Sequence, residues 1–156
     1  MDLGQQLREL MRRVPAPVSV VTTEVDGRRY GITVGSLISL SLEPPLVGMS
    51  ISRDTQLNAL LKEADCFAAS MLGGDQGWIA HHFSRSVPPL ILWNGIPLRD
   101  REGPPEIDGA NGWLRCVRRD AFEVGTHTLF VGEVVEVEAG RGGAALLYAG
   151  RSYHAL

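Results

Sequence analysis

Apolar and polar residues alternate along much of the chain, which predicts a protein built mainly of strands. Ile38, Leu40 and Leu42 alternate with Ser39 and Ser41, and a period of two is typical of a strand. We expect the apolar face to point into the core and the serine face to offer hydroxyl groups that donate and accept hydrogen bonds. An ordinary edge strand with a polar solvent face would show the same pattern.

Similar patterns predict further strands, separated by turns. These strands are expected at residues 18–23, 28–33, 46–51, 66–72, 112–121, 128–139 and 144–148. Asp26-Gly27 is a hairpin turn signal, and residues 122–125 and 140–143 should also be turns. The end of the 128–139 strand alternates valine with glutamate, so one side of it should face solvent. About seven such strands indicate a closed or nearly closed antiparallel β-barrel.

Three short helices are expected between the strands. The first is predicted by apolar residues spaced three or four apart, the second has Asp54 or Thr55 as its N-cap, and the third follows Asp75 as a cap. These helices cover residues 3–13, 56–63 and 76–83. Residues 84–112 are rich in proline and glycine, and a stretch of this length is usually a functional loop or lid.

Length, composition and charge fit one globular domain over residues 1–156. Apolar residues make up 44% of the chain and charged residues 21%. The net charge of −3 gives no basic signature, and no apolar run is long enough to span a membrane, so neither nucleic acid nor a membrane is an expected partner. Cys66 and Cys116 lie in apolar runs and are interpreted as buried, reduced thiols, which favours a cytoplasmic protein.

The histidines are the first candidates for metal binding or proton transfer in this sequence. His81 and His82 are neighbours that cannot face one site from a helix, so no metal site is expected. His127 lies where a turn enters a long strand, and its imidazole could bind substrate or move a proton near neutral pH. A histidine that only bonds the backbone at a strand end is an equally good interpretation.

Two stretches could approach a ligand through their backbone. Gly31 and Gly35 lack side chains, so the amides beside them can come close to a bound molecule. The helix expected from residue 56 has unpaired amides at its start, and Arg53 adds a positive charge, so a phosphate could bind there. A capped surface helix beside a solvated arginine would look the same.

Five segments, taken in order, resemble the flavin reductase-like family, whose members have an FMN-binding split barrel. They are residues 18–23 (VSVVTT), 31–47 (GITVGS and SLSLEPPLV), 67–76 (FAASML and DQ), 125–134 (GTHTLFVGEV) and 146–153 (LLY and Tyr153). The resemblance implies a mainly β chain with short helices, folded as an antiparallel split β-barrel of the FMN-binding type.

The resemblance also implies which residues hold the flavin. It assigns the ring and ribityl contacts to Thr33, Val34, Gly35, Ser36 and Ser39. It assigns the ribityl–phosphate end to Ser50, Ser52, Arg53 and Thr55.

Three more residues acquire roles by the same resemblance. Phe83 would lie beside the cofactor or the dimer partner, and Tyr153 would close the site, from the other subunit or its own. His127 would face the nicotinamide side of the flavin as the catalytic residue.

The implied function is reduction of FMN, or of FAD, by NADH or NADPH in a homodimer that supplies reduced flavin to a partner monooxygenase. The small size and the lack of an obvious adenine pocket favour FMN. Two departures keep an alternative open, a flavin-binding electron carrier or sensor without NAD(P)H turnover. His81-His82 replaces a basic pair, and Thr126 replaces the acid that usually precedes His127.

Overall fold

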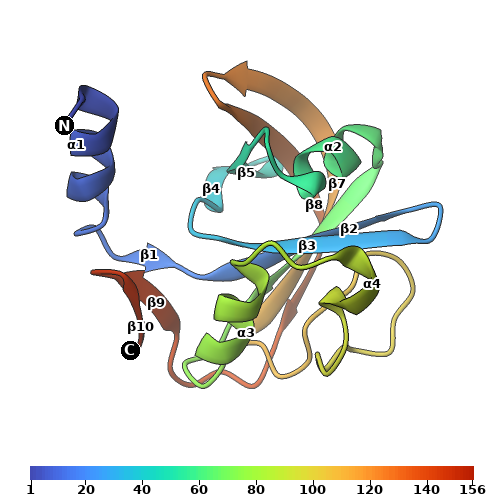
Figure 1. The fold of residues 1–156 in the computed structure, drawn as a ribbon. Helices are drawn as coiled ribbons and strands as arrows, with labels where there is room; N and C mark the ends of the chain where they lie inside the picture. Colours follow the sequence, from blue (N-terminus) through green and yellow to red (C-terminus); the bar gives the residue numbers. More distant parts are fainter.

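The computed structural model describes residues 1–156 as two antiparallel sheets with four short helices (Figure 1). The strands are β1 (Ala16–Pro17), β2 (Ser19–Val25), β3 (Arg28–Val34), β4 (Ile38–Leu42), β5 (Pro45–Ser52), β6 (Cys66–Met71), β7 (Gly112–Val124), β8 (His127–Ala139), β9 (Leu146–Ala149) and β10 (Ser152–Ala155). The helices are α1 (Leu3–Met11), α2 (Gln56–Glu63), α3 (Gly77–Phe83) and α4 (Pro89–Leu92). The expected mainly β fold with antiparallel strands is confirmed. No helix is long and apolar enough to cross a membrane.

The larger sheet has seven strands in the order β3-β2-β6-β7-β8-β5-β4. Its two edge strands, β3 and β4, follow each other in the chain and are joined only by residues 35–37. The sheet therefore curls until its edges approach each other, yet they do not pair. This open seam makes the barrel a split one, and residues on either side of it are free to contact a ligand.

Buried side chains from the strands form the core, and β2 is buried on both of its faces. Fully buried residues include Val20, Val21, Met49, Ile51, Phe67 and Phe130. Leu57 and Leu61 of α2 are also fully buried against this core. Gly132 on β8 is required by the packing, because a Cβ there would lie 2.5 Å from the Phe67 ring. The glycine lets the aromatic ring press directly on the strand.

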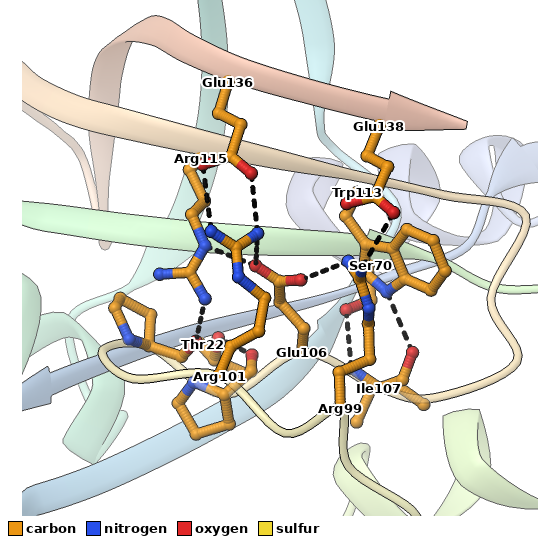
Figure 2. Close-up of polar contacts among 12 residues, drawn as sticks. Thr22, Ser70, Arg99, Arg101, Glu106, Ile107, Trp113, Arg115, Glu136 and Glu138 are labelled. Atoms are coloured by element: carbon orange, nitrogen blue, oxygen red, sulfur yellow. Dashed lines mark hydrogen bonds and ion pairs between the residues drawn. The ribbon is translucent and has the colours of Figure 1, made fainter. Parts of the chain in front are cut away.

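The long segment between α4 and β7 is packed onto the barrel by polar contacts (Figure 2). The Thr22 hydroxyl donates to the Pro105 carbonyl at 2.5 Å, and the Ile107 amide donates to the Ser70 hydroxyl at 2.9 Å. Glu106, whose side chain is completely buried, accepts from three arginines. Residues 97–110 are thus fastened to β2, β6, β7 and β8.

Some expected boundaries are wrong. β7 continues to Val124, so the turn expected over residues 122–125 is shorter. Asp75 does not cap α3; its carboxylate pairs with Arg141 instead, and the residue before α3 makes no side-chain capping bond. α4 is a helix that the pattern did not predict. For α2 the cap is Thr55, whose hydroxyl accepts from the Asn58 amide at 3.2 Å.

Three apolar faces are on the surface, and the one on β4 contradicts the sequence interpretation. In β4, expected to be core-directed on one face, Ile38 and Leu42 are 54% and 86% exposed. In β8, Val135 and Val137 face solvent, whereas the alternating glutamates bond arginines of the 97–110 segment. The third face belongs to α1, which projects from the barrel and buries no residue (Figure 1).

The two cysteines are unpaired, as expected. Cys116 is fully buried, and this burial raises the pKa of its thiol to about 12. Cys66 is only half-buried, so the expectation of buried thiols holds fully for one of the two.

Candidate functional site

Two adjoining cavities lie along β3 and meet at Thr33 and Ser84. The larger, of about 670 Å³, reaches Asp54, Thr55 and Gln56 at the start of α2. The smaller, of about 380 Å³, opens toward the β9–β10 hairpin. Together we call them the β3 groove. Six of the residues predicted to hold a flavin line it, namely Thr33, Val34, Gly35, Thr55, Phe83 and Tyr153.

Thr33 stands at the junction of the two cavities. Its hydroxyl donates a 2.6 Å hydrogen bond to the Ala80 carbonyl of α3. The bond uses the only hydroxyl proton and leaves oxygen lone pairs that can accept from a ligand. Thr33 therefore joins β3 to α3 and offers an acceptor in the middle of the groove.

Ser36 and Ser50 join the loop after β3 to β5. The Ser36 hydroxyl donates to the Ser50 carbonyl and accepts from the Ser50 amide, both at 3.0 Å. This pair fixes the loop after β3 against β5. The Ser50 hydroxyl makes no hydrogen bond within the chain and remains available. Ser39 pairs with Val47 across β4 and β5 and is exposed on the same edge of the sheet.

The start of α2 lies at one corner of the groove. The Thr55 hydroxyl donates to the Ser52 carbonyl at 2.8 Å and accepts from the Asn58 amide, and the Asp54 amide lies 3.4 Å from the Ser52 hydroxyl. These contacts hold the turn before the helix in place. The first amides of a helix lack partners within it and carry a partial positive charge, which suits a phosphate.

Arg53, expected beside the phosphate, already has a carboxylate partner. Its guanidinium lies 3.1 Å from Glu123 near the tip of the β7–β8 hairpin, and Lys62 lies 2.9 Å from the same carboxylate. The hydrogen bonds from Lys62, and then from Arg53, hold the pKa of Glu123 below its usual range. All three side chains are about half exposed, so a phosphate could compete with Glu123 for Arg53.

His127 begins β8, where it lies opposite Ser52 in the pairing of β5 with β8. Its Nδ1 is 2.9 Å from the Thr126 hydroxyl. The residue that replaces the expected acid thus still contacts the ring, but a hydroxyl adapts to either tautomer and imposes no charge. The other ring nitrogen has no partner within the chain and can meet a substrate.

Tyr153 reaches the groove from its own chain, on β10. Its ring is 5.0 Å from the Tyr148 ring, and the Tyr148 side chain lines the same cavity. Partial burial raises the pKa of Tyr153, so its hydroxyl remains protonated and able to donate at neutral pH. Phe83 is fully buried at the base of the groove, with its ring 5.4 Å from Trp93.

Several groove residues were not found from the sequence. Ser84 and Arg85 follow Phe83 directly, and Arg151 lies in the turn before Tyr153. Their nearness in sequence to predicted residues was the only available signal. His82 is held by the Leu92 carbonyl at 2.7 Å from its Nε2, and no group of three or more potential metal ligands exists in the chain.

The groove suits a molecule with an anionic end, a polar middle and a flat apolar part. The anionic end would lie at α2, the hydroxyls of Thr33 and Ser84 lie midway, and Gly35 leaves the far part open. A Cβ at Gly35 would come within 3.1 Å of Ala16, so a larger residue there would crowd the wall of the smaller cavity. A flavin mononucleotide has these three parts in this order.

Comparison with known proteins gives a consistent picture. A family model described as the flavin reductase like domain matches residues 11–156. The reductase component of the 4-nitrophenol 4-monooxygenase/4-nitrocatechol 2-monooxygenase of Rhodococcus opacus is 32% identical over 149 residues, covering 96% of this chain and 80% of the relative. The NADH:riboflavin 5'-phosphate oxidoreductase of Streptomyces pristinaespiralis is 34% identical over 137 residues, covering 87% and 78%.

A solved structure shares the whole fold. The NADH:FAD oxidoreductase SgcE6 of Streptomyces globisporus C-1027, in complex with NAD and FAD fragments, superposes with a TM-score of 0.89 at 30% identity. The match covers 97% of this chain and 92% of that one. The split barrel described above is therefore the architecture of these enzymes.

Proposed function

Because the chain belongs to the flavin reductase-like family, we propose that it is an oxidoreductase that reduces FMN or FAD with NADH or NADPH. The observation that carries the proposal is the β3 groove, which joins an anion-binding helix start to hydroxyls and an open glycine. A bound flavin would supply the chemistry by accepting a hydride from the reduced nicotinamide.

Residues that line the groove, and others beside it, bind and orient the cofactor in this proposal. Thr55 and the start of α2 hold the phosphate, with Arg53 as a second cation. Thr33, Ser36 and the backbone around Gly35 hold the ring and the ribityl chain. Donors fixed in advance at the polar edge of the ring stabilise negative charge as it develops there, at no cost of reorganisation. Ser39, Ser50, Ser52, Phe83 and Tyr153 complete the proposed set.

His127 is the proposed catalytic residue, on the nicotinamide side. Its free ring nitrogen would hydrogen-bond the substrate, while Thr126 orients the ring. We expect His127→Ala to slow flavin reduction about tenfold or more and to leave the flavin dissociation constant unchanged. His154→Ala, which removes an exposed histidine outside the groove, is the matched control. An unchanged rate in His127→Ala, measured by stopped-flow absorbance, would remove this role.

The relatives suggest which kind of protein receives the reduced flavin. The Rhodococcus opacus relative is the reductase component of a 4-nitrophenol 4-monooxygenase/4-nitrocatechol 2-monooxygenase. We propose that this chain likewise supplies reduced flavin to a partner monooxygenase. The two unpaired cysteines fit a reducing compartment and support a cytoplasmic location.

A homodimer is the proposed assembly. Apolar side chains of α1 and of β4 are exposed in the single chain, and exposed apolar surface can mark an interface. Sedimentation velocity should give twice the chain mass. The double substitution Leu7→Glu and Leu10→Glu should shift the protein toward monomer, whereas Arg8→Gln on the same helix should not. A wild-type monomer would contradict the proposal.

One experiment separates reductase from carrier or sensor, the alternative favoured by the missing acid beside His127. Under anaerobic conditions, FMN or FAD is added to the protein, followed by NADH and then NADPH. Perturbed flavin absorbance that bleaches with a nicotinamide nucleotide supports the reductase. Perturbed bands that stay oxidised support the carrier or sensor, and unperturbed bands with both flavins would contradict flavin binding.

A further inference from the structure

A second groove continues from the α2 end of the β3 groove. Its volume is about 540 Å³, and it shares Tyr30, Gln56 and Pro89 with the larger cavity. It lies between α2, the turn joining β2 to β3, and α4. We call it the α2 groove. Its shared end is where the phosphate of a bound flavin is proposed to lie.

The α2 groove runs along the helix, away from the proposed ring site. Gln56, Ala59, Leu60 and Glu63 line it, and their spacing of three, four and seven places them on one face of α2. Seven residues of helix span about 10 Å. The groove therefore extends from the phosphate corner by roughly the length of one more nucleotide.

The walls combine a flat apolar surface with two cations. Leu60, Pro89, Leu90 and Trp93 form the apolar part, and Leu90 is 94% exposed with nothing covering it. The Arg29 guanidinium lies 5.5 Å from the centre of the Trp93 ring, and its Nε is buried without any hydrogen-bond partner. A buried donor left unpaired is costly unless a ligand or water satisfies it.

The second cation is held at the side of the groove. Arg28 pairs with Glu63 at 2.7 Å, and both side chains are more than half exposed. A phosphate could bind Arg28 from the solvent side, and the Glu63 carboxylate can accept hydrogen bonds from ribose hydroxyls or an exocyclic amine. Apolar walls for a base, cations for phosphate and a carboxylate acceptor together suit a nucleotide.

We infer that the α2 groove binds the adenylate half of a dinucleotide, an assignment that rests on the proposed flavin site. The adenylate of FAD and that of NAD(P)H have the same chemistry, and the position of the groove beyond the flavin phosphate fits either. The pocket was not evident in the sequence because it is built from three separate segments, residues 27–30, 56–63 and 89–93.

A groove-filling variant tests the assignment. Ala59→Trp places a large side chain in the α2 groove from an exposed helix position, and Ala59→Ser is the control that leaves it open. Dissociation constants for FMN and FAD are measured by flavin fluorescence. Michaelis constants for NADH and for reduced nicotinamide mononucleotide, which lacks the adenylate, are measured with FMN.

Two results support the inference and identify the source of the adenylate. If FAD supplies it, Ala59→Trp weakens FAD binding about tenfold and leaves FMN binding unchanged. If the nicotinamide dinucleotide supplies it, the variant raises the NADH Michaelis constant by a similar factor and leaves that of the mononucleotide unchanged. Unchanged FMN binding also shows that the variant is folded.

A charge pair gives an independent test. Arg28→Gln should weaken binding of the adenylate-bearing ligand, whereas Glu63→Gln breaks the same ion pair but keeps the cation, and should not reduce the phosphate contact. The inference is wrong if Ala59→Trp and Arg28→Gln both leave FAD affinity and the NADH Michaelis constant unchanged while FMN still binds. A wild-type protein that binds neither flavin would instead overturn the proposed function, and this assignment with it.

Discussion

Arginine side chains occur in two contrasting settings in this protein. Around Glu106, three arginines from the 97–110 segment and β7 converge on one buried carboxylate (Figure 2). Arg53, next to the β3 groove, and Arg28, in the α2 groove, each have a single exposed partner, and Arg29 in the α2 groove has an unpaired Nε. The first group is satisfied within the chain, whereas the second keeps capacity for a ligand.

The Glu106 cluster is satisfied at every position. Arg99 lies 2.6 Å from Glu106 and 2.8 Å from Glu138, and Arg101 lies 3.3 Å from Glu106 and 2.6 Å from Glu136. Arg115 completes the set with a direct bond to Glu106. Arg99 also stacks on Trp113, with its guanidinium carbon 3.9 Å from the ring centre. Burying charged groups costs free energy of desolvation. The Glu106 cluster is therefore stable only while its carboxylate stays paired with the arginines.

The two groups of charged side chains are expected to have different roles, one in stability and one in ligand binding. A buried carboxylate with three cations fastens a long loop that has little regular structure of its own. Half-exposed cations with one weak partner contribute little to stability, because solvent screens them. Substitutions in the first group should therefore change stability, and substitutions in the second should change ligand binding.

The largest effect is expected for Glu106→Gln. It leaves three arginines around a neutral amide, and removing one partner of a buried ionic network should lower the free energy of unfolding by about 3 kcal/mol. Urea denaturation measures the loss. Glu102→Gln, an exposed glutamate in the same loop, is the control. A Glu106→Gln protein as stable as wild type would show that the cluster is not structural.

The next effect concerns Arg53. Arg53→Met should weaken FMN binding about tenfold, since a charge-assisted bond to phosphate contributes about 1.5 kcal/mol or more. Riboflavin, which lacks the phosphate, should bind both proteins equally. Arg119→Met removes another exposed arginine that is paired with Glu133, and should leave both affinities unchanged. If Arg53→Met lowered the affinities for FMN and riboflavin equally, Arg53 would affect the structure of the site and not the phosphate contact.

Glu123→Gln should act in the opposite direction and more weakly. Without the carboxylate, Arg53 is free for the phosphate, so FMN should bind several-fold more tightly and riboflavin should be unaffected. The comparison is made by fluorescence titration at low ionic strength, where exposed charges are least screened. Weaker FMN binding in this variant would indicate that Glu123 helps to hold Arg53 in its binding position.

The smallest effect is expected at the exposed rim of the Glu106 cluster. The hydrogen bond from Arg101 lowers the pKa of Glu136 below its usual range. The Glu136 carboxyl group thus binds a proton less tightly in the folded protein than in the unfolded chain. The Arg101–Glu136 pair therefore stabilises the fold at pH values above the ordinary pKa of glutamate, and this contribution is lost as the pH falls through the lowered pKa. Glu136→Gln should be slightly less stable than wild type at pH 7, and the difference should vanish in acid. A difference independent of pH would assign the effect to packing.

Much of the fold could be predicted because the signals are local. Alternation and turn residues identified most strands, and the Thr55 cap follows from residue type and position. The order of the motifs identified the family, and with it the residues around Thr33 and Gly35 that line the groove. These features depend on neighbours within a few positions in the chain.

The tertiary structure alone decided which faces are covered and which charges are paired. The valine–glutamate alternation predicted that one side of β8 faces solvent. In the structure Val135 and Val137 face solvent, and Glu136 and Glu138 pair with Arg101 and Arg99 of the 97–110 segment. Arg53 meets Glu123 only because β8 pairs with β5 on one side and with β7 on the other. The α2 groove requires three segments that lie far apart in sequence.

Local sequence signals were therefore enough to predict the mainly β class, the family and the capped start of α2. The long-range contacts could be seen only in the folded chain; they are the buried Glu106 cluster, the ion pair of Arg53 with Glu123 and the groove along α2. The physical reason is that backbone periodicity and capping act over a few residues. Charge pairing and cavities, in contrast, depend on segments that only folding brings together.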